Sequence, residues 1–207
     1  MSRDNILHRV RTALGRSAGQ AVADPPPVRI RIPEVDMEER ILSLMARVEA
    51  LAGVACRTSD PRGFVAQAIA GKTAVASNAP YLAECGITSL PGVRSGITHL
   101  DELRGLCASV DVGITSADYA LADTGTLVML AGPREARLVS LLPPAHIAVV
   151  PRDRILTGLD ELFSILPRPA EQTSSMVLIT GPSRTADIEQ ILVRGVHGPG
   201  QITVVIV

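Results

Sequence analysis

The chain has 207 residues, of which 46% are hydrophobic and 2% aromatic, and its formal net charge is −1. This length suffices for one full domain with an appendage and is too short for two ordinary domains. A near-neutral charge, two Phe, two Tyr and no Trp argue against surfaces that bind nucleic acids or anionic membranes. Since no apolar run in the sequence approaches the ~20 residues of a membrane span, we expect a cytoplasmic protein with an aliphatic core.

The N-terminal segment has helical spacing. Within residues 1–17, Ile6, Leu7, Val10 and Leu14 share one stripe. Its arginines also permit an organelle-targeting peptide, but 19 of the 20 basic residues in the chain are Arg, so arginine here reflects general usage. We expect an amphipathic helix that docks on the domain or on a partner.

A break follows this helix. Residues 18–33 include three consecutive prolines, which favour an extended spacer over a helix. We therefore expect residues 1–35 to form an N-terminal helix and Pro-rich linker, and residues 36–207 to form one α/β domain.

Helical and strand patterns alternate through the rest of the chain. The expected helices are 36–51, 63–70, 100–107, 158–166 and 185–194. The expected strands are 54–56, 73–77, 110–115, 127–130, 139–142, 147–150, 176–180 and 201–207. This alternation indicates a mixed, mostly parallel sheet covered by helices on both faces. Several strands between residues 110 and 150 lack a long helix between them, so part of the sheet is expected to be antiparallel.

Cysteine and histidine spacing does not favour a metal site. Cys56, Cys85 and Cys107 are widely and irregularly spaced, with no CxxC pair, and are expected to be small buried hydrophobic residues. The four histidines show no HxxH or HxxxH pairing; they are His8, His99, His146 and His197. We expect no metal and no cofactor in this chain.

The segment 177–189 reads as a strand, a glycine turn, a hydroxyl-rich loop and a helix. Free N–H groups at a helix start attract anions, and Gly181, Ser183, Arg184 and Thr185 would add donors for a carboxylate or phosphate. The alternative is that Ser183 or Thr185 only caps the helix.

A second glycine-rich segment, residues 195–200, precedes the final strand and contains His197. His197 is a candidate catalytic residue, and a purely structural role in the turn is equally plausible. If residues 185–194 form one straight helix, His197 lies at the opposite end from Arg184, so the two are not expected to share a site.

The segment 114–126 places polar groups after a strand. It forms either a simple hairpin turn or a ligand loop, with Asp118 or Asp123 as a base or hydrogen-bond acceptor. In the ligand-loop alternative, the orienting residues are Thr124, Gly125 and Thr126.

Four further polar residues stand nearby. Arg134, Glu135 and Arg137 fall in the next loop, and His146 precedes a strand. Each alone is typical of a solvated charge or of a satisfied residue at a strand edge.

Four motifs occur in a fixed order, at residues 113–127, 140–147, 179–189 and 195–199. Together they resemble the lactate-utilisation protein C (LutC/YkgG) family, a branch of the LUD domain proteins. The resemblance is dense over residues 100–207. It implies a fold similar to the NagB/RpiA/CoA-transferase-like group and a part in bacterial oxidation of L-lactate to pyruvate, with iron–sulfur clusters carried by two companion proteins.

Three functions follow as hypotheses. The first is a non-redox subunit of this lactate-oxidising system, with Arg184 receiving a carboxylate or phosphate. The second is a stand-alone enzyme or binding protein for a phosphorylated sugar or an acyl-CoA compound, by analogy of fold. The third is a structural or regulatory module. The sequence leaves open whether the chain is itself an enzyme.

Overall fold

The computed structural model of the protein describes residues 2–20, 32–185 and 193–207. The chain divides into two compact units, residues 1–31 and residues 32–207. The described part of the first unit, residues 2–20, contains the helix α1 (Arg3–Ala13), which begins after Ser2. The Ser2 side chain accepts a hydrogen bond from the backbone N–H of Asn5, at 3.4 Å, and so caps the helix. None of the described residues of α1 is buried.

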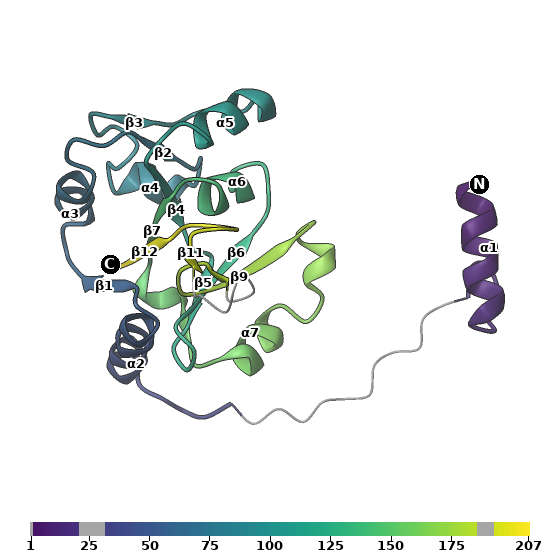
Figure 1. Ribbon diagram of the computed structural model, residues 1–207. Coiled ribbons are helices and arrows are strands. Elements are labelled where there is room, and N and C mark those ends of the chain that lie inside the picture. Colours follow the sequence, from purple (N-terminus) through teal and green to yellow (C-terminus); the bar gives the residue numbers. More distant parts are fainter. Residues whose placement is uncertain (1, 21–31, 186–192) are drawn as a thin grey trace. The chain divides into compact units, whose positions relative to one another are not determined.

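A six-stranded parallel sheet forms the centre of the second unit (Figure 1). Its strands, in order across the sheet, are β1 (Val54–Arg57), β12 (Gln201–Ile206), β7 (Ala145–Val150), β4 (Val112–Ser116), β2 (Ala74–Ala76) and β3 (Val93–Arg94). Every neighbouring pair is parallel. The carboxyl ends of these strands therefore lie at one edge of the sheet, and their amino ends at the other.

Helices cover both faces of this sheet, because alternate side chains of each strand point to opposite faces. On one face Ile114, Ile147 and Val205 pack against helices α3 (Pro61–Ala68) and α4 (Pro80–Glu84). On the other face Val75 packs against α5 (Leu100–Cys107) and α6 (Arg137–Leu141). The expected α/β class, with a mostly parallel sheet between helices, is confirmed.

A second, four-stranded sheet carries the antiparallel pairing that the sequence predicts. Its order is β8 (Ile155–Leu156), β5 (Tyr119–Leu121), β6 (Thr126–Leu130) and β9 (Met176–Thr180). Strands β5 and β6 form the expected hairpin, and β6 is antiparallel to β9. Leu162 of helix α7 (Leu159–Ile165) packs against side chains of these strands and forms a separate hydrophobic cluster with them. These strands therefore form a separate sheet and not a part of the parallel one.

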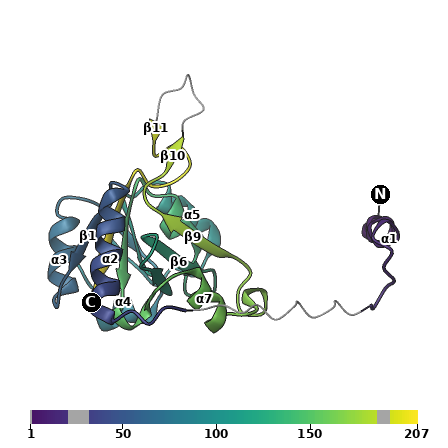
Figure 2. The same ribbon diagram turned by 90° about the horizontal axis from the view of Figure 1, so that it is seen from below.

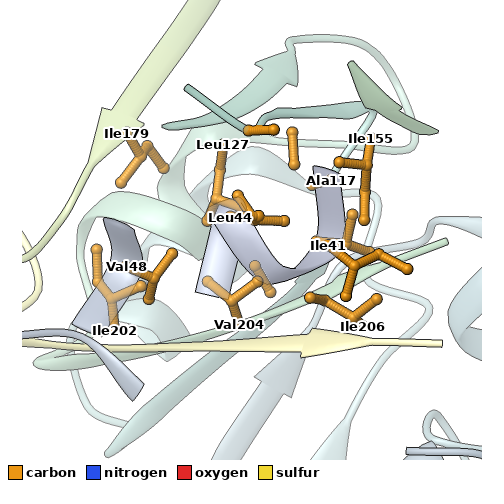
Figure 3. Close-up of a cluster of buried hydrophobic side chains, with 14 of the residues drawn as sticks. Ile41, Leu44, Val48, Ala117, Leu127, Ile155, Ile179, Ile202, Val204 and Ile206 are labelled. Atoms are coloured by element: carbon orange, nitrogen blue, oxygen red, sulfur yellow. The ribbon is translucent and has the colours of Figure 1, made fainter. Parts of the chain in front are cut away.

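Helix α2 (Met37–Ala50) lies between the two sheets (Figure 3). Its buried residues Ile41, Leu44 and Val48 contact side chains of the parallel sheet on one side and of the second sheet on the other. Burying one such side chain contributes roughly 1.5–3 kcal/mol. The helix begins at Asp36, whose Oδ1 accepts a hydrogen bond from the N–H of Glu39 at 2.9 Å. Helix α2 is thus what holds the second sheet on the first.

Most expected elements are confirmed, but two segments differ. The sequence predicts a strand at residues 139–142, but residues 139–141 belong to α6 and residue 142 caps it, because a short buried apolar run has no periodicity that separates strand from helix. The prediction of a helix at residues 185–194 is wrong at both of its described ends, because these ends belong to two strands. β10 (Arg184–Thr185) pairs antiparallel with β11 (Val193–Arg194). Residues 186–192 of that expected helix lie outside the described residues. Figure 2 shows β10 and β11 standing away from the body of the domain.

Two short 3₁₀ helices complete the described elements, η1 (Arg152–Arg154) and η2 (Pro169–Glu171). In the part of the chain that the structure describes, no helix has the length and apolar character needed to cross a membrane.

Candidate functional site

A polar hollow of about 430 Å³ opens at the carboxyl ends of β2, β4 and β7. Ligands of open parallel sheets generally bind at this edge, because the loops that follow the strands converge there. We call it the carboxyl-end hollow; it is lined by Ala79, Pro80, Tyr81, Glu84, Ser116, Ala117, Asp118, Arg134, Glu135, Pro151 and Arg154.

Glu135 is the most buried charged residue of this hollow, with 8% of its surface exposed. The loop between β6 and α6 carries it over the end of β2, where Ser77 Oγ donates a hydrogen bond to its Oε2 at 2.7 Å. The other oxygen, Oε1, is buried and has no hydrogen-bond partner among the described residues. Burial raises the pKa of Glu135 to about 8 and the nearby charge of Asp118 adds to this rise, while the hydroxyl of Ser77 and the backbone N–H of Ser116, which lies near the carboxyl, lower it. Glu135 is therefore mostly a neutral acid at pH 7.

Asp118 lies between β4 and β5 and is half-buried. Its Oδ2 accepts a hydrogen bond from the N–H of Leu130 at 2.7 Å, which fixes the carboxyl against the end of β6. Burial raises the pKa of Asp118, while this hydrogen bond and the charge of Arg154 lower it. Two carboxyls with raised pKa values in one hollow are a common arrangement at functional sites.

Two exposed arginines supply positive charge to the hollow. Arg134 precedes Glu135 in the same loop, and Arg154 ends the 3₁₀ turn after β7. The guanidinium of Arg154 lies over the ring of Tyr119, with its central carbon 5.7 Å from the ring centroid. Guanidinium groups bind carboxylates and phosphates, so this hollow can hold a small anion beside a neutral acid.

The residues that the sequence singled out lie mainly at the opposite edge of the parallel sheet. Gly181, Ser183, Arg184 and His197 line one groove of about 580 Å³ near the amino end of β12. We call it the amino-end groove; it is also lined by Leu51, Leu141, Val177, Leu178, Ile179, Thr180, Pro182, Gly198, Pro199 and Ile202.

The prediction that His197 lies far from Arg184 is wrong. The N–H of His197 donates a hydrogen bond to Ser183 Oγ at 3.3 Å, and both side chains line the groove. The expected separation requires one straight helix between them, whereas Arg184–Thr185 pairs with Val193–Arg194 and brings the two loops together. The backbone of Arg184 is extended rather than helical, and its guanidinium donates to the carbonyl of Leu51.

Residues 122–125 connect β5 to β6. Thr126 Oγ1, at the start of β6, lies 2.8 Å from Thr180 Oγ1 and donates to Thr124 Oγ1 at 2.8 Å, so these hydroxyls join the turn and β6 to the end of β9. Gly125 has φ +71°, and a Cβ there would lie 2.9 Å from Arg47 Cβ in α2. The turn is therefore fitted closely to α2.

Asp118 and Asp123 are not brought together. They lie at opposite ends of β5, Asp118 in the carboxyl-end hollow and Asp123 exposed in the turn. Among the candidate residues of the sequence, Asp118 is the member that lines the carboxyl-end hollow.

Two polar residues expected to be solvated or at strand edges are buried. They are Glu135, described above, and His146, which is 1% exposed within β7. The Nε2 of His146 lies 2.8 Å from Thr115 Oγ1, and burial lowers the pKa of the ring to about 4. No local pattern marks either residue, because their burial depends on loops and helices that are distant in sequence.

The sequence of the chain is similar to those of known proteins. Residues 34–207 match the LUD domain. The chain belongs to the LUD domain family. A relative from Bacillus mycoides, named Lactate utilization protein C 1, is 30% identical over 100% of this chain and 97% of that protein. Another, named Lactate utilization protein C, from Halalkalibacterium halodurans, is 35% identical over 65% of this chain and 62% of that protein. The resemblance to the LutC branch is thereby confirmed.

A solved structure shares the fold of this LUD domain protein. It is a DUF162 family protein from Deinococcus radiodurans, with a TM-score of 0.64 and 19% identity over 84% of this chain and 99% of that one. At this level of identity the likeness establishes the fold. The chemistry of the carboxyl-end hollow and of the amino-end groove depends on the residues of this chain.

Proposed function

We propose that this LUD domain protein is a non-redox component of a system that oxidises L-lactate to pyruvate, and that it binds a small carboxylate in the carboxyl-end hollow. The relative from Bacillus mycoides, matched over nearly its whole length, carries a lactate-utilisation name. The observation that carries the binding proposal is that Arg134 and Arg154 line one hollow with two acids of raised pKa, at the edge where parallel strands end.

The redox chemistry belongs, in this proposal, to iron–sulfur partner proteins. The cysteines of this chain lie on three separate elements: Cys56 in β1, Cys85 after α4 and Cys107 in α5. Cys107 is buried and the other two are half-buried, so they suit packing better than the shared ligation of a cluster. The companions are tested by capturing the tagged full-length chain from cells grown on L-lactate. Iron, acid-labile sulfide and lactate-dependent dye reduction in the eluate support the proposal, and capture of the chain alone refutes it.

A second candidate site is supported by the amino-end groove. Ser183, Arg184 and His197 line it, so it offers a hydroxyl, a guanidinium and an imidazole to a phosphorylated sugar or an acyl-CoA compound. This alternative needs no lactate and no partner.

Titration calorimetry with matched variants separates the two sites. Arg154→Ala should weaken L-lactate or pyruvate binding by about tenfold or more, since a hydrogen bond to a charged group contributes roughly 1.5–3 kcal/mol. Arg184→Ala, at the other edge of the sheet, should leave that affinity unchanged. The opposite result would assign the ligand to the amino-end groove. The same two variants, returned to a strain that lacks the native gene, should differ likewise in growth on L-lactate.

A further inference from the structure

Glu135 has an unusual combination of one satisfied and one free oxygen. Ser77 Oγ donates to Oε2 at 2.7 Å, whereas Oε1 is buried and without a partner among the described residues. If Oε2 accepts this hydrogen bond, the proton of the neutral acid lies on Oε1. A buried donor left unsatisfied costs roughly 1–3 kcal/mol, and an acceptor atom of a ligand in the hollow would recover this energy.

The groups around Glu135 define what ligand would supply that acceptor. The other charged or titratable residues of the carboxyl-end hollow come from α4, the turn after β4, the loop of Glu135 and the segment after β7; they are Tyr81, Glu84, Asp118, Arg134 and Arg154. Arg104 of α5 and Arg137 of α6 line a separate hollow that Glu135 also borders. In the carboxyl-end hollow the two arginines balance Glu84 and Asp118 while Glu135 is neutral, so a ligand carboxylate would bind by direct contact with one of the two guanidinium groups. An oxygen on the carbon next to that carboxylate could then reach the Glu135 carboxyl.

We propose that Glu135 is a specificity-determining residue of this site, which recognises the C2 oxygen of a 2-oxo carboxylate by donating a hydrogen bond from Oε1. This inference rests on the proposed function, in which the carboxyl-end hollow holds a small carboxylate. Ser77 is the positioning residue, because its hydroxyl holds Oε2 and leaves Oε1 as the free oxygen.

The protonation state of Glu135 then controls which acid binds. A 2-oxo group only accepts hydrogen bonds, so it is repelled once Glu135 has ionised. A 2-hydroxyl group can also donate, and it therefore keeps a partner in the ionised carboxylate. Burial holds the pKa of Glu135 at about 8, so at pH 9 only about a tenth of the free protein carries the proton. The apparent affinity for a 2-oxo acid falls in proportion to that fraction.

The test is calorimetric titration of the full-length chain with pyruvate, L-lactate and propionate at pH 7 and pH 9. Propionate has the same carboxylate and no C2 oxygen. We expect the affinity for pyruvate to fall by about tenfold between the two pH values, and the affinities for L-lactate and propionate to fall less. In Glu135→Gln the amide stays neutral and can still donate, so its pyruvate affinity should not show this fall. The exposed acid Glu49, on α2, provides the control Glu49→Gln, which should behave as the wild type.

A second measurement uses the wild-type protein, so its result does not depend on whether a variant folds. At pH 8.5, pyruvate titrations in buffers of different ionisation enthalpy should show net uptake of a proton, and propionate titrations should show less. An equal fall of pyruvate and propionate affinity, or the same fall in Glu135→Gln, overturns the role of Glu135 while the binding site stands. If the wild type binds none of the three acids at pH 7, the carboxylate site of the proposed function is itself refuted, and the inference with it.

Discussion

Replacing Glu135 by Gln should change how the stability of the protein depends on pH. In the unfolded chain this carboxyl ionises near pH 4.5, and in the folded chain its pKa is about 8. Between these values the folded state holds a proton that the unfolded state has released, so the free energy of unfolding falls as pH rises. Gln has no proton to lose and can still accept the hydrogen bond of Ser77. The variant is therefore expected to lose less stability than the wild type on going from acid to alkaline pH.

The size of the effect follows from the pKa difference. Each pH unit in which only the unfolded state is ionised costs about 1.4 kcal/mol, so between pH 5 and pH 8.5 the wild type should lose roughly 4 kcal/mol relative to Glu135→Gln. Urea unfolding followed by circular dichroism at both pH values measures the difference. The control is Glu84→Gln, an exposed acid of the same hollow. If Glu135→Gln and wild type lose stability in parallel, Glu135 is not held neutral by burial, and the reasoning is refuted.

Three further outcomes are expected. Gly113→Ala should destabilise the protein by more than about 2 kcal/mol in thermal unfolding, because the new Cβ would lie 1.9 Å from the carbonyl oxygen of Val139, which is backbone and cannot turn aside; a variant as stable as wild type would contradict this. Thr115→Val should cost about 1–3 kcal/mol in urea unfolding, because it removes the hydroxyl that bonds the buried ring of His146. His146 itself, with a pKa lowered to about 4 by burial, should show no titration of its ring nitrogens between pH 8 and pH 5.5 in NMR spectra, and a midpoint near 6.5 would show that the ring is solvated.

The position of the site shows where local patterns mislead. Gly181, Ser183, Arg184 and Thr185 resemble a loop between a strand and a helix whose first N–H groups bind an anion. Such a loop would lie at the carboxyl end of a parallel strand. In the structure that strand, β9, belongs to the second sheet and is antiparallel to β6. Its carboxyl end therefore points toward the amino-end groove, away from the edge where β2, β4 and β7 end.

The order and type of most elements follow from local patterns in the sequence. Apolar strand runs, helical stripes and caps such as Asp36 are local, and the energies that specify them act within a few residues. The hairpin at residues 123–126 is another local feature, since Gly125 permits the positive φ that the turn requires. The ordered motifs also identified the family, because they act as a set and need no coordinates.

The grouping of polar residues in one hollow arises from the packing of the folded chain. Ser77, Asp118 and Arg154 follow strands of the parallel sheet, whose register brings them to one edge, and Glu135 reaches the same edge from the loop after β6 of the second sheet. The burial that makes Glu135 neutral and His146 uncharged comes from elements distant in sequence, so neither residue differs locally from a solvated one. Desolvation depends on all the atoms that surround a group, and that environment exists only after the chain has folded.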